Sequence, residues 1–177
     1  QVDKEMHRFI ARIELFKGLE DYYDDIAKLM TIKQYKAGVT IFRHGEVHDG
    51  FYNIVSGVLT KIIDFVTTSE NISDIQGFSS SSAGAGSHIP VTNRFNLPLE
   101  VGELTENSTV GAFTAVSRDS KAEFTCVTKV SCVVLFIEKH NFQKLASYAS
   151  PLRDKINAQL RLHREAMQKN DVSQNFK

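Results

Sequence analysis

Short apolar stretches separated by glycines constrain the fold of this chain more than any other feature. Between residues 35 and 66, valines, isoleucines and phenylalanines form short runs that are interrupted by Gly38, Gly45, Gly50 and Gly57. Such runs are typical of short antiparallel strands that are joined by tight turns. We therefore predict a β-rich centre, with strands at 39–42, 51–55, 58–66, 123–128 and 130–137.

Helical periodicity flanks this centre on both sides. Apolar residues recur at helical spacing before and after a break at Gly18, and residues 139–146 are predicted to form another helix. Ser150 and Pro151 mark the start of a last helix, because serine caps helices and proline fits the first helical position. Helices, then strands, then helices predict an α+β fold whose centre is an antiparallel β jelly-roll barrel. The last helix carries an apolar stripe that consists of Leu152, Ile156, Leu160, His163 and Met167.

A length of 177 residues is enough for one domain with one core. Inside the predicted barrel, residues 67–96 contain four consecutive serines and few large apolar side chains, which indicates a flexible insertion in one loop. We expect a single domain over residues 1–169. Its parts are N-terminal helices at 1–34, the barrel at 35–137 and C-terminal helices at 138–169, followed by a polar tail at 170–177.

Charge and hydropathy restrict the partners of the chain. Lys and Arg number 21, and so do Asp and Glu, so no basic field attracts nucleic acid or an anionic membrane. No apolar run reaches the length of about 18 residues that a membrane-spanning helix needs. Because the chain begins with Gln1 rather than Met, we expect a cytosolic fragment of a longer polypeptide that does not itself enter a membrane. Cys126 and Cys132 are expected to be reduced thiols.

Four segments in the first third of the chain have a distinctive order and spacing. They are Leu15-Phe16-Lys17-Gly18-Leu19, Tyr35-Lys36-Ala37-Gly38-Val39-Thr40-Ile41, Gly45-Glu46 and Asp49-Gly50-Phe51-Tyr52-Asn53-Ile54-Val55-Ser56-Gly57. Further along, Thr125 lies seventeen residues before Phe142. This pattern resembles the cyclic-nucleotide-binding domain family over essentially the whole chain apart from the insertion. The resemblance implies the fold predicted above.

The resemblance also implies a phosphate-binding cassette. In this family a glycine and a short helix offer backbone N–H groups, a glutamate accepts from the ribose hydroxyl, and an arginine pairs with the cyclic phosphate. Aligned on Thr125, the glycine is Gly111, the glutamate position holds Ala112 and the arginine position holds Ala122. The candidate pocket residues are Gly111, Ala112, Phe113, Thr114, Lys121, Ala122, Glu123, Phe124 and Thr125.

Both charged contacts of the cassette are therefore missing at the aligned positions. Charge-assisted hydrogen bonds contribute roughly 1.5–3 kcal/mol each, so their loss weakens binding by about 3–6 kcal/mol, on the order of 10²- to 10⁴-fold. We predict a non-catalytic regulatory or interaction module of a larger protein, such as a transporter, channel, phospholipase or signalling protein. Its expected partners are other domains of the same polypeptide or a separate protein. By the same resemblance the last helix is the output or lid element, represented by Leu160, His163 and Met167. If this helix closes as a lid, His163 could touch a ligand, whereas the favoured interpretation is a histidine packed at the edge of the apolar stripe.

Alternative interpretations stay open at this point. Lys121 or Arg118 could replace the missing arginine in a genuine cyclic-nucleotide sensor, and Gly102-Glu103-Leu104 could be a displaced cassette. His44, Glu46 and His48 stand at alternate positions, as ligands of a metal-dependent cupin-like enzyme do. No glycine-flanked nucleophile is present, so the leading interpretation expects no enzyme activity and no cofactor.

Overall fold

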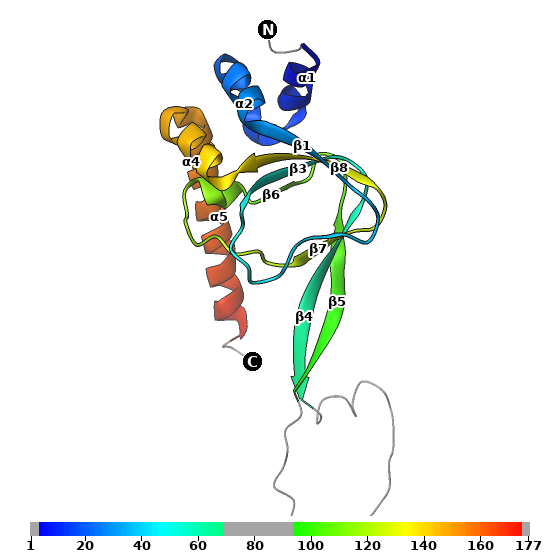
Figure 1. The fold of residues 1–177 in the computed structure, drawn as a ribbon. Coiled ribbons are helices and arrows are strands. Elements are labelled where there is room, and N and C mark those ends of the chain that lie inside the picture. The colour runs from blue at the N-terminus through cyan, green and yellow to red at the C-terminus, as the bar shows by residue number, and fades with distance from the viewer. Residues whose placement is uncertain (1–3, 69–93, 175–177) are drawn as a thin grey trace, which may run out of the picture.

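The computed structural model describes residues 4–68 and 94–174. Two four-stranded antiparallel sheets lie one above the other at its centre, with strand orders β1-β8-β3-β6 and β2-β7-β4-β5 (Figure 1). The predicted α+β fold with a jelly-roll centre is confirmed, although the two sheets stay separate and do not close into a barrel. The strands are β1 Met30–Tyr35, β2 Thr40–Phe42, β3 Gly50–Ser56, β4 Leu59–Thr68, β5 Arg94–Leu104, β6 Thr109–Val110, β7 Thr125–Thr128 and β8 Cys132–Glu138.

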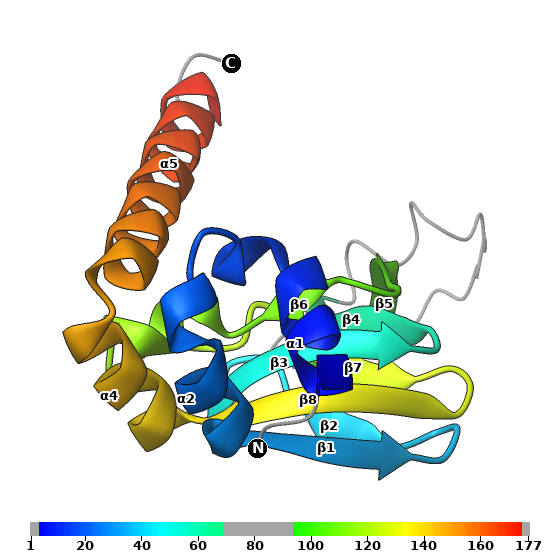
Figure 2. The same ribbon diagram turned by 90° about the horizontal axis from the view of Figure 1, so that it is seen from above.

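Helices precede the first strand and follow the last strand in the sequence. Seen from above, α5 leaves the domain and extends away from the strands (Figure 2). The described part of the chain contains no helix with the length and apolar character that crossing a membrane requires. The helices, with η for a 3₁₀ helix, are α1 Lys4–Arg12, η1 Glu14–Phe16, η2 Glu20–Tyr22, α2 Tyr23–Leu29, η3 Ala112–Ala115, α4 Lys139–Tyr148 and α5 Ser150–Gln174.

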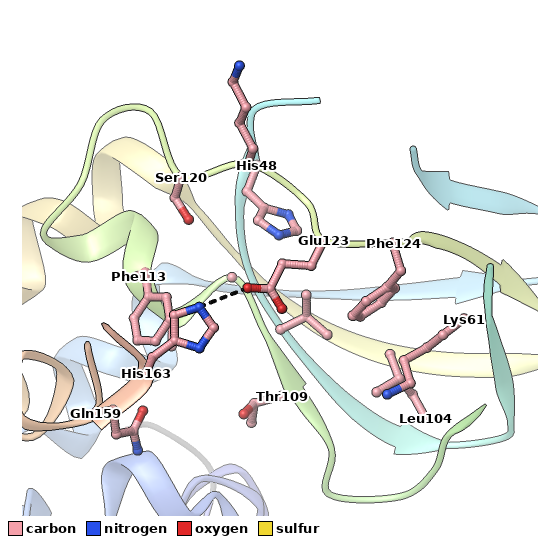
Figure 3. A pocket seen from close by; sticks show the side chains of 14 residues that line it. His48, Lys61, Leu104, Thr109, Phe113, Ser120, Glu123, Phe124, Gln159 and His163 are labelled. Carbon is pink, nitrogen blue, oxygen red and sulfur yellow. Dashed lines mark ion pairs between the residues drawn. The ribbon is translucent and has the colours of Figure 1, made fainter. Parts of the chain in front are cut away.

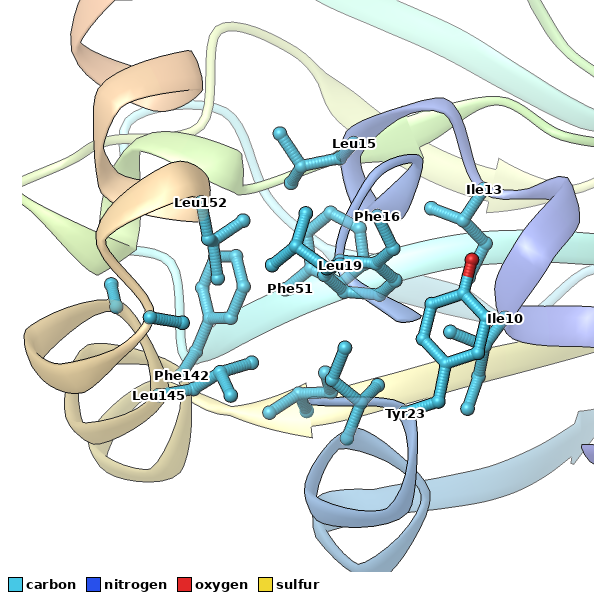
Figure 4. Packing of buried hydrophobic residues seen from close by; sticks show 14 of the residues in the cluster. Ile10, Ile13, Leu15, Phe16, Leu19, Tyr23, Phe51, Phe142, Leu145 and Leu152 are labelled. Carbon is cyan, nitrogen blue, oxygen red and sulfur yellow. The ribbon is translucent and has the colours of Figure 1, made fainter. Parts of the chain in front are cut away.

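The larger hydrophobic cluster joins the first sheet to the helices at both ends of the chain (Figure 4). Phe51 of β3 stacks on Phe142 of α4 with ring centroids 4.9 Å apart, and it lies 5.5 Å from the ring of Phe16 in η1. All three side chains are fully buried. The N-terminal and C-terminal helices are thus held against the same strand by one group of aromatic rings.

A second cluster fills the space between the two sheets and includes both cysteines. Cys126 of β7 and Cys132 of β8 are buried and free. Burial raises the pKa of the Cys126 thiol to about 12, so this thiol stays protonated at neutral pH. The cysteines therefore act as small apolar core residues.

Four predicted boundaries need correction. Residues 30–34, expected in the N-terminal helices, form β1, because they pair with β8 from Met30↔Ile137 onward. The tail expected at 170–177 is helical as far as Gln174, since neither glycine nor proline ends the helix before that residue. The expected insertion also began too early and ended too late. Residues 67–68 belong to β4 and 94–96 to β5, and the rest of the predicted insertion lies outside the described residues.

The strands β4 and β5 extend beyond the sandwich as a two-stranded arm (Figure 1). Phe65 and Leu99 expose more than half of their surface on it. Pro98 on the outer strand has no amide hydrogen, so it limits the addition of a further strand at this edge.

The end of this arm gives a first prediction. Thr68 and Arg94 are directly opposed, so a two-residue Asn-Gly turn can join them in place of residues 69–93. Loop-closure entropy changes slowly with loop length, so we expect the melting temperature to fall by less than about 8 °C. Thermal unfolding measures the melting temperature. The control replaces residues 69–93 by a glycine-serine linker of the same length, so it changes the sequence of the loop and not its length. A larger fall in both variants would show that the sequence of residues 69–93 stabilises the domain, whereas a larger fall in the short-loop variant alone would show that the tight turn strains the end of the arm.

Candidate functional site

A cavity of about 330 Å³ opens between η3, the segment after it, the strands β4 to β6 and helix α5 (Figure 3). This volume lies at the lower end of the range of about 300–1,000 Å³ that is common for small-molecule sites. Both aromatic and polar side chains line it. The lining residues are His48, Lys61, Leu104, Thr109, Val110, Gly111, Ala112, Phe113, Ser120, Lys121, Glu123, Phe124, Gln159 and His163.

Gly111 sets the position of η3 at the cavity wall. Its φ of +82° lies in the left-handed region, and a Cβ atom there would lie only 2.1 Å from the carbonyl oxygen of Gly50. Thr114 is fully buried, and its hydroxyl donates to the Gly111 carbonyl at 2.6 Å. Glycine at this position is therefore required both by conformation and by the close approach of β3.

The segment after η3 lines the cavity with Ser120, Lys121, Glu123 and Phe124, whereas Ala122 does not line it. Lys121 forms a β-bridge with Val47, and the amide of Ala122 donates to the Glu46 carbonyl at 2.8 Å. Ala122 is only 2% exposed and packs in the second cluster.

The alignment on Thr125 put the arginine position at Ala122. Ala122 does not line the cavity and packs in the second cluster, whereas its neighbours Lys121 and Glu123 line the cavity. Thr125 itself does not line the cavity. Its hydroxyl accepts a hydrogen bond from the His44 amide at 2.9 Å. Lys121, rather than residue 122, therefore supplies a cation to the cavity wall.

Helix α5 reaches the cavity through His163. Its Nε2 lies 3.1 Å from Oε1 of Glu123, forming an ion pair when the imidazole is protonated, and its ring centroid lies 5.6 Å from that of Phe113 (Figure 3). The side chains of His163 and Glu123 are 37% and 64% exposed. Exposed pairs of this kind contribute about 0–1 kcal/mol, so this contact holds α5 only weakly. Leu160 and Met167, the other two residues named for the predicted output helix, do not line the cavity, and Met167 is exposed where the helix extends away from the domain.

His48 is a buried polar group on the opposite wall. The residue is 7% exposed, and its ring packs edge-on against Phe42 with centroids 4.9 Å apart. Its Nδ1 is buried and has no hydrogen-bond partner within residues 4–68 and 94–174. Burial lowers the pKa of His48 below its ordinary value of 6.5, so the ring is neutral at neutral pH.

The structure brings six of the nine predicted pocket residues to the cavity. Sequence reasoning missed the polar residues on distant elements, such as Lys61, Thr109 and Gln159, because no local motif marks them. It considered His48 only as a metal ligand. The six that line the cavity are Gly111, Ala112, Phe113, Lys121, Glu123 and Phe124, and the three that do not are Thr114, Ala122 and Thr125.

The remaining candidates lie elsewhere. Arg118 does not line the cavity, and its backbone carbonyl accepts from the Lys139 ammonium group. Of the displaced cassette only Leu104 lines the cavity, whereas Glu103 pairs on the surface with Lys129 at 2.8 Å. His44 and Glu46 are exposed, and no cluster of three or more His, Cys, Asp or Glu side chains suited to a metal ion occurs among the described residues.

Comparisons with known proteins agree on the fold. No protein-family model matches the chain, and no curated protein matches it. Among solved structures, the catabolite activator protein of Thermus thermophilus has a TM-score of 0.61 at 16% identity, over 90% of this chain and 62% of that one. The regulatory domain of Toxoplasma gondii PKA with cAMP has a TM-score of 0.59 at 17% identity, over 88% of this chain and 49% of that one.

A third neighbour is the regulatory subunit of a cAMP-independent protein kinase A from Trypanosoma cruzi bound to guanosine. It has a TM-score of 0.57 at 14% identity, over 87% of this chain and 44% of that one. The chain thus spans between 44% and 62% of the length of these three proteins. These likenesses show that the chain has a cyclic-nucleotide-binding-domain-like fold.

Proposed function

We propose that the chain is a non-catalytic regulatory or interaction module of a larger protein, and that its cavity does not hold a cyclic nucleotide in the manner usual for this fold. The fold and the contact of α5 with the cavity support this proposal. A ligand in the cavity would alter the contact between His163 and Glu123, and α5 would carry that change to a neighbouring domain or partner protein. The proposed setting is the cytoplasm, as part of a transporter, channel, phospholipase or signalling protein.

The observation that carries the proposal is the carboxylate of Glu123 on the cavity wall. It stands two residues after Lys121 on the cavity wall, where its negative charge opposes an anionic phosphate. Ala112, also on the wall, offers no acceptor for a ribose hydroxyl. Lys61 is the other lysine of the wall, and its Nζ lies 5.3 Å from the ring centroid of Phe124.

A genuine cyclic-nucleotide sensor is the second candidate, and the position of Lys121 on the cavity wall favours it. A lysine binds phosphate as a point charge and lacks the bidentate geometry of arginine. Binding through Lys121 would therefore be weaker than through the arginine of the family, and it would disappear in Lys121→Ala.

Titration calorimetry with cyclic AMP and cyclic GMP tests the proposal. We expect no saturable isotherm in the low micromolar range. Ala112 offers no acceptor for a ribose hydroxyl, and the Glu123 carboxylate repels a phosphate. A low-micromolar isotherm that Lys121→Ala abolishes would establish the sensor instead.

A restored variant provides the positive control. It combines Ala112→Glu, Lys121→Arg and Glu123→Ala, which places the family's two charged groups on cavity-facing positions and removes the opposing carboxylate. We expect measurable affinity for cyclic AMP in this variant. The same variant with Lys121→Ala in place of Lys121→Arg is the matched negative control, since it keeps the other two changes and lacks the cation.

A further inference from the structure

Helix α1 presents a face with two arginines and a phenylalanine to the outside of the domain. The helix lies on the outer side of the first sheet and places Ile10 in the larger hydrophobic cluster (Figure 1). Residues three and four apart share one face of a helix. Four exposed residues with this spacing line a hollow of about 210 Å³, namely Glu5, Arg8, Phe9 and Arg12.

The two guanidinium groups of this α1 hollow are not engaged by other side chains. Within residues 4–68 and 94–174, neither Arg8 nor Arg12 takes part in a hydrogen bond or an ion pair. The guanidinium carbon of Arg12 lies 5.8 Å from the ring centroid of Phe9. Lys4 precedes Arg8 by one turn, and Glu5 is the one carboxylate among the described residues that line the hollow. Positive charge is therefore in excess on this face.

A second, smaller hollow adjoins the α1 hollow, because Phe9 and Arg12 line both. It borders the outer face of the first sheet, where Asn53 pairs with Leu135, and its volume of about 10 Å³ suits one water-sized group. Asn53 is only 3% exposed, and its amide nitrogen lies 3.5 Å from each of two carbonyl oxygens, which is long for a hydrogen bond. The second hollow thus contains a buried amide that is only weakly hydrogen-bonded.

The turn between β5 and β6 forms the other wall of the second hollow. Glu106 and Asn107 line it, and the Asn107 amide donates to the Ile54 carbonyl at 2.8 Å. The Ile54 amide donates to the Ser108 carbonyl at 2.9 Å, so the turn is fixed to β3. This wall carries the carboxylate of Glu106, whereas the α1 side carries the arginines. A bound segment is therefore oriented by charge, with its acidic groups on the α1 side.

We propose that this face of α1 docks an acidic peptide segment of a partner protein. In an extended peptide, alternate residues lie about 6.6 Å apart on one side, close to the distance of about 5–6 Å between residues four apart on a helix. Two acidic residues at alternate positions of the peptide therefore bind Arg8 and Arg12. An apolar residue at the next alternate position packs on Phe9, and Asn53 offers a donor to the peptide backbone.

Charge complementarity carries the choice of this partner, since arginine clusters recognise acidic motifs. An anionic membrane fits less well, because each basic residue contributes only about 1 kcal/mol at a lipid surface and the wall with Glu106 opposes it. The two hollows share no lining residue with the cavity beside η3. The inference therefore goes beyond the proposed function and does not depend on it.

Fluorescence anisotropy of the full chain with two labelled peptides tests the inference. The probe is Gly-Ser-Glu-Ser-Glu-Ser-Leu-Ser-Gly, and its control carries glutamine in place of both glutamates. We expect the glutamate peptide to bind saturably and at least about tenfold more tightly than the glutamine peptide. Arg8→Ala and Arg12→Ala should each weaken it at least about threefold, and both together at least about tenfold. Arg161→Ala removes an exposed arginine of α5 outside both hollows and should leave the affinity unchanged.

Circular dichroism establishes that each variant is folded. Absence of saturable binding of the glutamate peptide at millimolar concentration overturns the inference. Equal affinity for the two peptides does so as well, and so does a loss in Arg161→Ala as large as that in the arginine variants of α1. Sedimentation with phosphatidylserine vesicles that the double variant abolishes, without peptide binding, would make the face a lipid site and overturn the inference. Cyclic-nucleotide titrations bear on the proposed function alone.

Discussion

Replacing Phe51 by alanine is expected to lower the free energy of unfolding by about 3–5 kcal/mol. The side chain is fully buried between the rings of Phe16 and Phe142, which belong to opposite ends of the chain. Its removal leaves a cavity that these rings cannot fill without moving the helices that carry them. The loss is a large part of the total stability of a domain, which is typically about 5–15 kcal/mol.

Urea-induced unfolding followed by circular dichroism measures this loss. Phe65→Ala is the matched control, because Phe65 is 54% exposed on the arm of β4 and β5. We expect its free energy of unfolding to change by no more than about 0.5 kcal/mol. Similar losses in both variants would show that the aromatic cluster around Phe51 does not hold the two ends of the chain together.

The centre of the fold could be predicted from the sequence because its signals are local. Glycines bound the apolar runs that became β3 and β4, and the Ser150-Pro151 pair marked the start of α5. The strand β1 was missed for a physical reason. Residues 30–35 follow α2 without a glycine or proline between them, and it is pairing with β8, about a hundred residues later, that makes them a strand.

The candidate site was predicted only where a motif carried it. Gly111 and the residues of η3 were placed at the cavity, because a short motif surrounds them. His48 and Gln159 reach it from parts of the chain that only the tertiary structure brings together. Ala122, the aligned arginine position, does not line the cavity, because its short side chain is buried in the second cluster. Residue spacing alone does not determine which side chains of this segment reach the cavity.

Replacing Gly111 by alanine is expected to lower the free energy of unfolding by about 2–6 kcal/mol. Left-handed backbone costs a non-glycine residue about 1–3 kcal/mol, and overpacking costs about the same again. At Gly111 both apply, since its φ is +82° and the new Cβ atom would lie 2.1 Å from the Gly50 carbonyl oxygen. Relief of this clash requires η3 to move away from β3, which also distorts the cavity wall.

Gly38→Ala separates the two contributions. Gly38 has nearly the same φ, +81°, but a Cβ atom there meets nothing within 4 Å. The fall in the free energy of unfolding of Gly38→Ala should therefore reflect backbone strain alone, about 1–3 kcal/mol. Urea unfolding of both variants measures the difference, which we assign to the contact between Gly111 and Gly50. Equal losses would mean that η3 moves away from β3 at little cost, and the cavity wall would then be adaptable at the point where the family's cassette begins.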